Sequence, residues 1–476
     1  MSTENTSQSV LIQQSIDSPR DQTPEGNAEI TDPVTNAILR WPTDRPLAIV
    51  NAGRLVPQAV GPGAPDPRSA ESRSTAPRWT ILASPTRVTP ITTPADLDAL
   101  LADRSTPTNH SRGIRTGTRN ETPPFRSGRL LALAYEAGHA LEPSLGRHPT
   151  RRPTDQPLGY ILECPDSAAF DHAANAWTTP PTGLRESPDP AGYRLGSLAS
   201  ETGADAYRAA VRIALGYICA GDVYQVNLAH RLTAPFEGSP RALAAALLRT
   251  ASPAHGFYAE LPTDDGRTPA ILSASPELFV SFDPATRTVR TSPMKGTRPI
   301  TGDAEELRAA EKDRAELNMI TDLMRNDLGR VCAFGSMRVE RARTIEAHGS
   351  SVWQATSTVS GTLRDEVSAA DLVRAAFPPG SVTGAPKIRA MQIIRELEPV
   401  PRGFYCGTLG WLDDDGGFSL NVGIRTATVA GDELRYHVGA GIVADSDPDA
   451  EWAETMGKAE VIGRLASADT PDQCGN

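Results

Sequence analysis

The chain has 476 residues, 39% of them hydrophobic, and a formal net charge of -11 at pH 7. This length allows one large domain or two to three domains of ordinary size. The acidic balance argues against nucleic acid as the main partner, because phosphate binding needs a basic surface, and no apolar run approaches the roughly 20 residues that span a bilayer.

The two ends of the chain and its cysteines indicate the compartment. Residues 1–40 are polar and lack the apolar core of a signal peptide, so we predict a disordered tail there, a flexible tail over 467–476 and a cytoplasmic location. The cysteines have no CxxC spacing, which favours free thiols over a disulfide framework or a zinc site. The five are Cys164, Cys219, Cys332, Cys406 and Cys474.

Residues 41–195 are predicted to form a loop-rich N-terminal subdomain. The stretches 55–80 and 103–128 are rich in Pro, Gly, Ser, Thr and Arg, which argues against long helices there. A short strand is expected over Trp79–Ala83, and Arg129–Leu141 is the first strong apolar stretch.

Residues 196–466 are predicted to form a more regular domain. Helical patterns cover 203–220, 239–251, 303–333, 368–377, 384–397 and 448–466. Strand patterns cover 223–233, 254–260, 270–282, 287–292, 407–413, 417–430 and 434–443. The elements lack the regular alternation of a parallel α/β sheet, so the expected fold class is α+β with antiparallel sheets.

Two predicted helices carry acid pairs at a spacing of three residues, Asp313 with Glu316 and Glu451 with Glu454. Each spacing places both carboxylates on one helix face. Two such faces opposed to each other would make an oxygen-rich site that suits Mg²⁺; the alternative is two solvated acidic faces. Lys458, four residues after Glu454, would hold an anion beside the metal or form an exposed Glu–Lys pair.

The strand pattern 418–428 alternates between an apolar and a polar face. Ser419, Asn421, Gly423 and Arg425 share the polar face. Small polar residues around one arginine suit a pocket wall with a carboxylate clamp, while an ordinary solvent-facing strand is the alternative.

Small residues and one lysine suggest further anion contacts. Gly439 and Gly441 flank Ala440 and would let backbone N–H groups approach a ligand. The turn at 380–387 opens a predicted helix, whose first N–H groups favour anions. Lys295, in PMKGTRP, could act as a nucleophile or base in a partly desolvated pocket; a surface turn lysine is the alternative.

The order of these segments carries more information than any one of them. Eight motifs follow one another over residues 200–465: GYICAGDVYQVNLAHR, SASPELFV, SPMKGTRP, EKDRAELNMITDLMRNDLGRVC, FPPGSVTGAPKIRAMQIIRELEP, RGFYCGTLGWL, SLNVGIRTATV and GAGIVADSDPDAEWAETMGKAE. The series resembles the chorismate-utilising enzymes, namely the large subunits of anthranilate synthase and aminodeoxychorismate synthase, isochorismate synthase and salicylate synthase. The resemblance implies two stacked antiparallel β-sheets flanked by helices, with a chorismate-binding catalytic domain at 196–466.

The same resemblance assigns roles to single residues. Glu316 and Glu454 correspond to direct Mg²⁺ ligands, and Asp313 and Glu451 to ligands that act through water. Glu277, in SASPELFV, matches a general acid that protonates the departing C4 hydroxyl, which is otherwise a poor leaving group. The implied substrate contacts are Gln225, Gly296, Thr297, Ser381, Tyr405, Arg425, Gly439, Ala440, Gly441 and Lys458.

Two positions separate members of this family. Isochorismate and salicylate synthases carry a water-activating lysine where this chain has Gln225, and many pyruvate-eliminating relatives carry a histidine near Gln354. Anthranilate synthases usually carry alanine at the position of Lys295. Lysine there is typical of aminodeoxychorismate synthases, in which it is thought to attack C2 of chorismate before ammonia adds at C4. The resemblance therefore implies formation of 4-amino-4-deoxychorismate on the way to p-aminobenzoate and folate.

The resemblance also implies partners. No glutaminase segment is recognisable and no lyase domain follows residue 466, so we expect a separate glutamine amidotransferase subunit that supplies ammonia and a separate lyase that releases p-aminobenzoate. The alternatives are anthranilate synthase, another ammonia-dependent chorismate enzyme, or an inactive homologue that serves as a binding subunit. The presence of Glu277, Glu316 and Glu454 argues against an inactive homologue.

Overall fold

The computed structural model describes residues 32–50, 78–102, 123–145, 156–187, 192–262, 268–348 and 352–466. The first 31 residues, most of the two predicted long loops and the predicted C-terminal tail lie outside these ranges. No helix in the described ranges is long and apolar enough to cross a membrane, and the four cysteines within them are free thiols.

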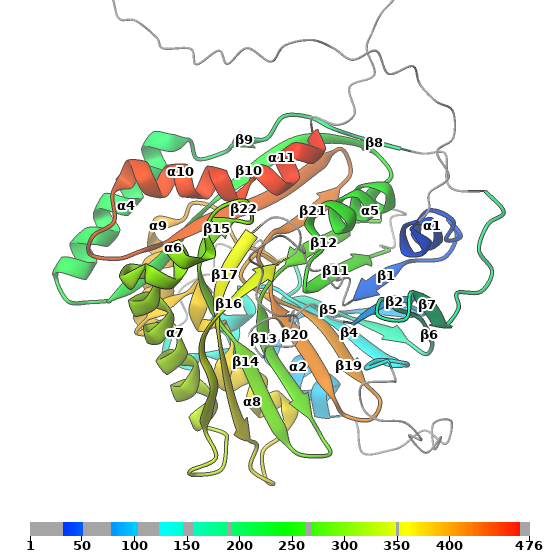
Figure 1. Cartoon of the computed structure of the whole chain (residues 1–476), viewed down its shortest axis with the longest axis horizontal. Helices are drawn as coiled ribbons and strands as arrows, with labels where there is room; N and C mark the ends of the chain where they lie inside the picture. Colours follow the sequence, from blue (N-terminus) through cyan, green and yellow to red (C-terminus); the bar gives the residue numbers. More distant parts are fainter. Residues whose placement is uncertain are drawn as a thin grey trace, which may run out of the picture.

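The described strands form two antiparallel sheets with helices around them, which confirms the predicted α+β class (Figure 1). The first, 12-stranded sheet has the order β18 (Gly384–Ala385), β10 (Gln225–Gly238), β22 (Glu433–Ile442), β21 (Thr426–Ala430), β12 (Ala270–Ser275), β11 (His255–Glu260), β1 (Ala48–Val50), β2 (Trp79–Ala83), β6 (Ser167–Asp171) and β7 (Ala176–Thr179). Two short strands, β8 (Tyr193–Leu195) and β9 (Ala199–Ser200), also pair with β10.

The second, 10-stranded sheet has the order β15 (Met294–Pro299), β17 (Val352–Thr362), β14 (Thr288–Ser292), β13 (Leu278–Asp283), β20 (Phe418–Val422), β19 (Thr408–Asp413), β4 (Gly128–Leu133), β5 (Gly159–Cys164) and β3 (Arg87–Ile91), with β16 (Arg338–His348) paired to β17. Both sheets take strands from either side of residue 196, because β1 and β2 join β11 to β6 while β4 joins β19 to β5. The boundary at that residue stays a prediction.

Eleven helices within the described residues surround the sheets. They are α1 (Pro33–Leu39), α2 (Pro94–Ala102), α3 (Ala137–Leu141), α4 (Ala204–Cys219), α5 (Pro240–Ala251), α6 (Ala304–Ala309), α7 (Glu311–Gly329), α8 (Ala369–Ala376), α9 (Lys387–Leu397), α10 (Pro448–Lys458) and α11 (Glu460–Ala466). The local sequence explains why several of these helices begin where they do. Ser239 and Asp447 cap α5 and α10, and each is followed by a proline in the first turn.

The disordered tail predicted over 1–40 is wrong for its last residues, which form α1. Asp32 caps this helix by accepting hydrogen bonds from the N–H groups of Val34 and Thr35, at 3.4 and 3.2 Å. Ile38 is buried at 1% exposure and packs in the core cluster that includes α5. A capped turn with one apolar face is thus enough to hold this segment on the domain.

Two long strands predicted from the sequence each change sheet partway along. The pattern 270–282 becomes β12 in the first sheet and β13 in the second, and the pattern 417–430 becomes β20 in the second and β21 in the first. The corners contact each other: the Val422 N–H donates to the Glu277 carbonyl at 3.0 Å, and the Ser275 hydroxyl donates to the Val422 carbonyl at 2.6 Å. Arg425 adopts a left-handed φ of 50° at the second corner, between the end of β20 and the start of β21, a conformation outside the strand region.

Three predicted helices also differ from the observed ones. The pattern 303–333 forms α6 and α7, which are broken at Ala310, where the backbone is extended. The pattern 448–466 forms α10 and α11. Helix α9 begins at Lys387 instead of 384, because Gly384 and Ala385 pair with β10 as β18.

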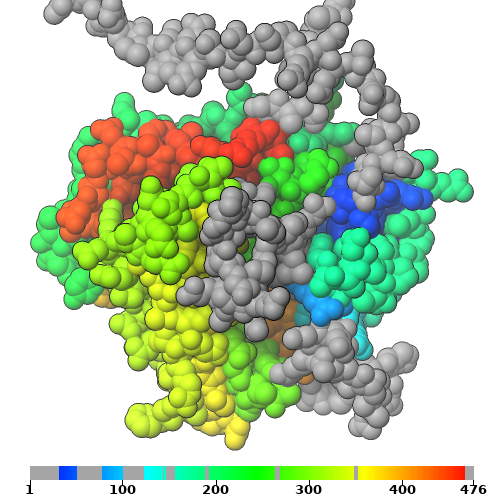
Figure 2. All heavy atoms as spheres, in the orientation of Figure 1, coloured from blue at the N-terminus to red at the C-terminus, as the bar shows by residue number. Residues whose placement is uncertain are grey.

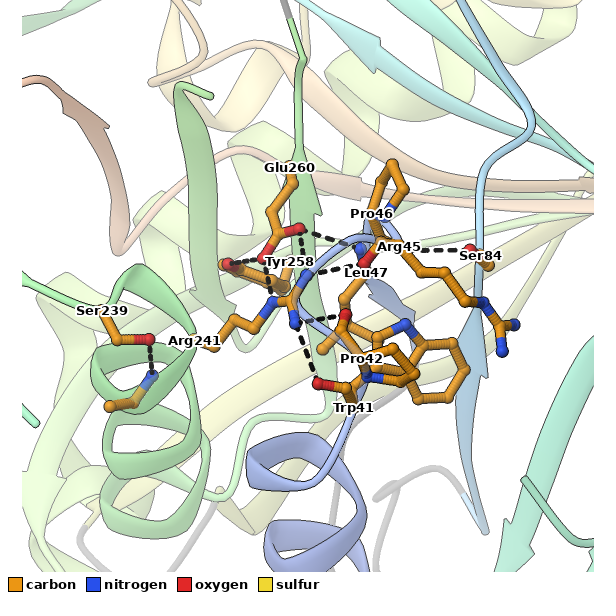
Figure 3. Close-up of polar contacts among 11 residues, drawn as sticks. Trp41, Pro42, Arg45, Pro46, Leu47, Ser84, Ser239, Arg241, Tyr258 and Glu260 are labelled. Atoms are coloured by element: carbon orange, nitrogen blue, oxygen red, sulfur yellow. Dashed lines mark hydrogen bonds and ion pairs between the residues drawn. The ribbon is translucent and has the colours of Figure 1, made fainter. Parts of the chain in front are cut away.

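A buried ion pair ties the N-terminal segment to the first sheet (Figure 3). The Arg241 guanidinium on α5 binds the Glu260 carboxylate on β11 and donates to the carbonyls of Trp41 at 3.1 Å, Pro42 at 2.9 Å and Arg45 at 2.7 Å. Glu260 also accepts from the Tyr258 hydroxyl at 2.8 Å and the Leu47 N–H at 3.0 Å. This network positions the chain between α1 and β1.

Helices from distant parts of the sequence meet at one end of the sheets. Helices α4 and α10 pack on β10 and β22, while α6 and α7 pack against β15 and β17 (Figure 1). In Figure 2 the red surface of α10 and α11 adjoins the yellow-green surface of α6 and α7. Lys312 of α7 acts electrostatically on Glu451 and Glu454 of α10, so the two helices that carry the predicted acid pairs lie near each other.

Candidate active site

The acids of α7 face strand β15. Asp313 accepts a hydrogen bond from Arg298 at 3.1 Å, and Glu316 lies 3.7 Å from the Lys295 ammonium nitrogen. The Asp313 and Glu316 side chains are 20% and 17% exposed, so neither lies on a freely solvated helix face. The alternative of two solvated acidic faces is thus wrong for α7.

The acids of α10 belong to the same cluster. Glu454 is 2.8 Å from Lys458 on its own helix, and Glu451 accepts from the Ser446 hydroxyl at 2.6 Å. Burial raises the pKa of Glu451. Burial also acts to raise the pKa of Glu454, but the charges of Lys458, Lys295 and Lys312 outweigh it and lower that pKa. Lys295 of β15 and Lys312 of α7 therefore lie within electrostatic reach of an α10 carboxylate.

The donor chemistry of this cluster fits Mg²⁺ without forming a closed cage. No three His, Cys, Asp or Glu side chains in the described ranges are gathered closely enough to hold a metal by themselves. Mg²⁺ commonly takes one or two carboxylates and keeps several waters, so it does not need such a group. Glu316 lies 3.7 Å from the Lys295 ammonium and Glu454 lies 2.8 Å from the Lys458 ammonium, so each carboxylate is paired with a positive charge.

Lys295 lies in a strand, so the surface-turn alternative is wrong. Strand β15 was not predicted from the sequence. The side chain of Lys295, which lies in this strand, is 15% exposed. Gly296 has a φ of 76°, and a Cβ there would lie 2.9 Å from Cγ of Asp313, so only glycine allows α7 to approach this closely. Thr297 accepts a hydrogen bond from the Gln354 amide at 3.2 Å.

Glu277 is a buried carboxyl close to Lys295. It is 3% exposed, and burial raises its pKa to about 7, against the opposing effects of the Ser381 hydroxyl, the Lys295 charge and the Met294 N–H. Its position follows from the first strand corner, which turns the chain at Pro276 between the two sheets. A carboxyl that stays protonated near neutral pH can act as a general acid.

Strands β10 and β22 provide the wall opposite Lys295. A Cβ at Gly441 would lie 2.8 Å from the Gln225 amide nitrogen and 3.1 Å from Nζ of Lys295. A Cβ at Gly439 would lie 2.8 Å from the Tyr405 hydroxyl. The glycines thus leave room for these groups. Ala440 points the other way, into the core, so only its backbone could contact a ligand.

Lys458 connects α10 to this wall. Its ammonium donates to the Gly439 carbonyl at 2.7 Å as well as to Glu454. The surface-pair alternative is therefore incomplete, since the side chain bridges a helix and a strand. Tyr405 lies on the open side of Gly439, and its ring stacks on His437 at an interplanar angle of 12°.

Arg425 is not on a shared strand face with Ser419 and Asn421, as the alternation had suggested. It lies at the second strand corner, after β20 has ended. The Asn421 amide is instead used within the fold, donating to the His255 carbonyl at 2.8 Å and accepting from the Leu409 N–H at 3.1 Å. The Arg425 guanidinium makes no hydrogen bond or ion pair with the described residues, and burial lowers its pKa.

Sequence reasoning missed two contributors to the site. Lys312 lies near both α10 acids, as their pKa shifts show, and Asn227 lies two residues after Gln225 on β10. The period of two along a strand places Asn227 on the same face as Gln225. The alternation of polar and apolar residues in QVN indicated that both amides share a face. Only the structure shows that this face of β10 is directed toward the site.

Comparison with known proteins agrees with this geometry. The profile described as chorismate binding enzyme matches residues 72–464. Anthranilate synthase component 1 of Streptomyces coelicolor is 38% identical over 381 residues, covering 71% of this chain and 73% of that protein. Aminodeoxychorismate synthase component 1 of Salmonella typhimurium is 44% identical over 253 residues, covering 52% and 54%.

A solved structure shows the same fold. Anthranilate synthase component I from Streptococcus pneumoniae superimposes with a TM-score of 0.67 at 26% sequence identity, covering 86% of this chain and 96% of that one. The similar proteins carry two different activity names, so similarity alone does not select between them. With the profile spanning most of the sequence and a relative matched over most of its length, the chain belongs to the chorismate-binding enzyme family.

Proposed function

We propose that the chain is the chorismate-aminating component of an aminodeoxychorismate synthase, which forms 4-amino-4-deoxychorismate from chorismate and ammonia. The position of Lys295 carries this proposal. Its largely buried ammonium lies 3.7 Å from Glu316 and acts electrostatically on Glu277 and Glu454. A lysine in such a site can serve as a nucleophile, and lysine at this position is typical of the aminodeoxychorismate synthases that the motifs resemble.

In the proposed reaction the Lys295 ammonium first gives a proton to solvent. Its neutral amine then attacks C2 of chorismate, both ring double bonds shift by one position and the C4–O bond breaks. Glu277 gives its proton to the departing hydroxyl, which leaves as water, and the attacking nitrogen returns a proton to Glu277. Ammonia then adds at C4, and Lys295 leaves C2 with the proton that the new amine gives up. The net change replaces one hydroxyl with one amino group and releases one water.

The carboxylate cluster supports a magnesium site in this scheme. Glu316 and Glu454 would hold the ion directly, and Asp313 and Glu451 would do so through water. When bound, Mg²⁺ would supply positive charge for the ring carboxylate of chorismate. The second carboxylate would be held by the groups on the opposite wall, which are Arg425, Tyr405, Lys458 and the backbone of Gly439–Gly441.

The proposed source of ammonia is a separate glutamine amidotransferase subunit. Both sets of relatives are named as component 1 of their synthase, which supports a second component. A separate lyase would then convert the product to p-aminobenzoate.

The test is product identity from the purified chain with chorismate, Mg²⁺ and ammonium at alkaline pH, with and without an aminodeoxychorismate lyase. We expect p-aminobenzoate only when the lyase is present. Lys295→Ala should reduce its formation at least about 1000-fold, because the covalent step is lost. Lys295→Arg is the matched control that keeps the positive charge, and it should be equally inactive.

Anthranilate synthase is the second candidate, favoured by the relative that matches the longer stretch of this chain. Its product is fluorescent and needs no lyase, so the same assay separates the two activities. Anthranilate formed by the parent chain, and still formed by Lys295→Ala, would overturn the proposed role of Lys295.

A further inference from the structure

Asn227 presents a buried amide on the side of the first sheet that faces Lys295. Val226 and Leu228, its neighbours in β10, point into the core cluster that contains α4 residues, so Asn227 points to the opposite face. Asn227 is directly paired with Gly441 of β22. Directly paired residues point to the same face of a sheet, and a Cβ on Gly441 would come within 3.1 Å of Nζ of Lys295.

The backbone of Asn227 is fully held by the protein. Its N–H donates to the Thr383 carbonyl at 2.8 Å. Its carbonyl accepts from Nη2 of Arg402, also at 2.8 Å. Arg402 is itself fixed by Glu398 in a buried ion pair. These contacts anchor the strand at this residue, so the side chain has a defined direction.

The Asn227 amide nitrogen, in contrast, has no partner among the residues that the structure describes. Asn227 is 6% exposed, so this donor is buried. Both polar atoms of the neighbouring Gln225 amide are also buried, with no partner in the described part of the chain. A buried donor that lacks an acceptor destabilises the folded chain, so two such amides side by side indicate groups that a ligand would satisfy.

We propose that Asn227 contacts the substrate directly, with its amide N–H donating to an oxygen of chorismate at the Lys295 end of the site. The identity of the substrate rests on the proposed function. Lys458 and Lys295 supply positive charge for carboxylates, whereas an uncharged amide donor suits a hydroxyl or ether oxygen. Asn227 would thereby orient the ring relative to the lysine that attacks it.

Asn227→Leu tests the proposal, because leucine has nearly the same shape and no polar atoms. We expect the thermal midpoint without substrate to stay the same or rise, because the unpartnered amide is removed. The kcat/KM for chorismate consumption should fall about 10- to 100-fold. The rise in midpoint on adding chorismate and Mg²⁺ should shrink. Asn227→Asp keeps the shape but replaces the donor with a negative charge, so its loss of kcat/KM should exceed that of the leucine variant.

Asn421→Leu is the matched control for a structural amide. Asn421 is 3% exposed and both ends of its amide are hydrogen-bonded within the protein, so this variant should lower the thermal midpoint. If Asn227→Leu lowers the midpoint in the same way, or changes kcat/KM less than about twofold, the proposal is wrong. The assay follows chorismate consumption and does not depend on which product forms. A parent chain that consumes no chorismate would contradict the proposed function. An Asn227→Leu variant with the same kcat/KM as the parent would contradict only the proposed contact of Asn227.

Discussion

Two buried polar regions of this protein differ in how completely their groups are paired. Around Arg241, the guanidinium nitrogens donate five hydrogen bonds, to Glu260 and to three backbone carbonyls. Around Lys295, the nearest carboxylate is 3.7 Å away. The amides of Gln225 and Asn227 on the neighbouring wall have buried atoms with no partner within the described ranges.

The difference distinguishes buried polar residues that stabilise the fold from buried polar residues that are available to a ligand. A fully paired buried ion pair holds elements together, and removing one member leaves the other charge uncompensated. Groups left unpaired weaken the fold and are retained where a ligand pairs them. The paired region should therefore respond to mutation mainly in stability, and the unpaired region mainly in substrate binding and turnover.

Arg241→Met gives the largest expected loss of stability. It should lower the free energy of unfolding by about 3–5 kcal/mol, because the Glu260 carboxylate stays buried without its partner. Urea denaturation measures this change. The double variant Arg241→Met/Glu260→Leu should recover a large part of the loss. A double variant as unstable as the single one would show that the charge pair does not determine the stability of this region.

Glu277→Gln should change stability in the opposite direction above neutral pH. Burial raises the pKa of Glu277 from 4.5 to about 7 in the folded protein. The parent is therefore most stable, with respect to this group, below pH 4.5, and it loses that stability as pH rises through 7. At pH 8 the glutamine variant should be more stable than the parent by on the order of 3 kcal/mol, and the difference should vanish near pH 4.5. Its turnover should fall about 100- to 10,000-fold.

Glu136 offers a matched control for Glu277. Burial also raises the pKa of Glu136 to about 7, but its carboxylate accepts the backbone N–H groups of Arg402 and Gly403 at 2.7 and 3.1 Å. Glu136→Gln should therefore leave turnover of the folded enzyme within about twofold of the parent. Equal losses of turnover in the two variants would remove the assignment of Glu277 as the general acid.

Lys458→Met gives the smallest expected change in stability. Lys458 and Glu454 form a half-exposed pair four residues apart, as do Arg464 and Glu460 on α11. Removing Arg464 should lower the free energy of unfolding by about 0.3–0.5 kcal/mol. Removing Lys458 should lower it by about 1 kcal/mol more, because the hydrogen bond to the Gly439 carbonyl is also lost. Only Lys458→Met should also raise the KM for chorismate, by about tenfold. A KM that changes equally in Arg464→Met would indicate a general charge effect instead of a contact at Gly439.

Much of the site could be predicted because its residues lie in short ordered motifs. The acid pairs on α7 and α10 were predicted from helical spacing, and Lys312 of α7 lies within electrostatic reach of Glu454 on α10. Lys295 was placed in the site by resemblance, although its local sequence favoured a surface turn. The prediction that Arg425 shares a strand face with Ser419 and Asn421 was wrong. The alternation of polar and apolar residues in the sequence continues up to Arg425, although β20 ends at Val422 and the chain turns there toward the other sheet.

The sequence by itself determined the mixed class and most of the helix starts that it predicted, because capping and periodicity act over a few neighbours. Tertiary structure alone decided which strands change sheet, which lysine is buried and which amides remain unpaired. These depend on contacts between β10, β15 and β22, which lie far apart in the sequence. Pairing and burial are set by what packs from elsewhere in the chain, so no local pattern contains them.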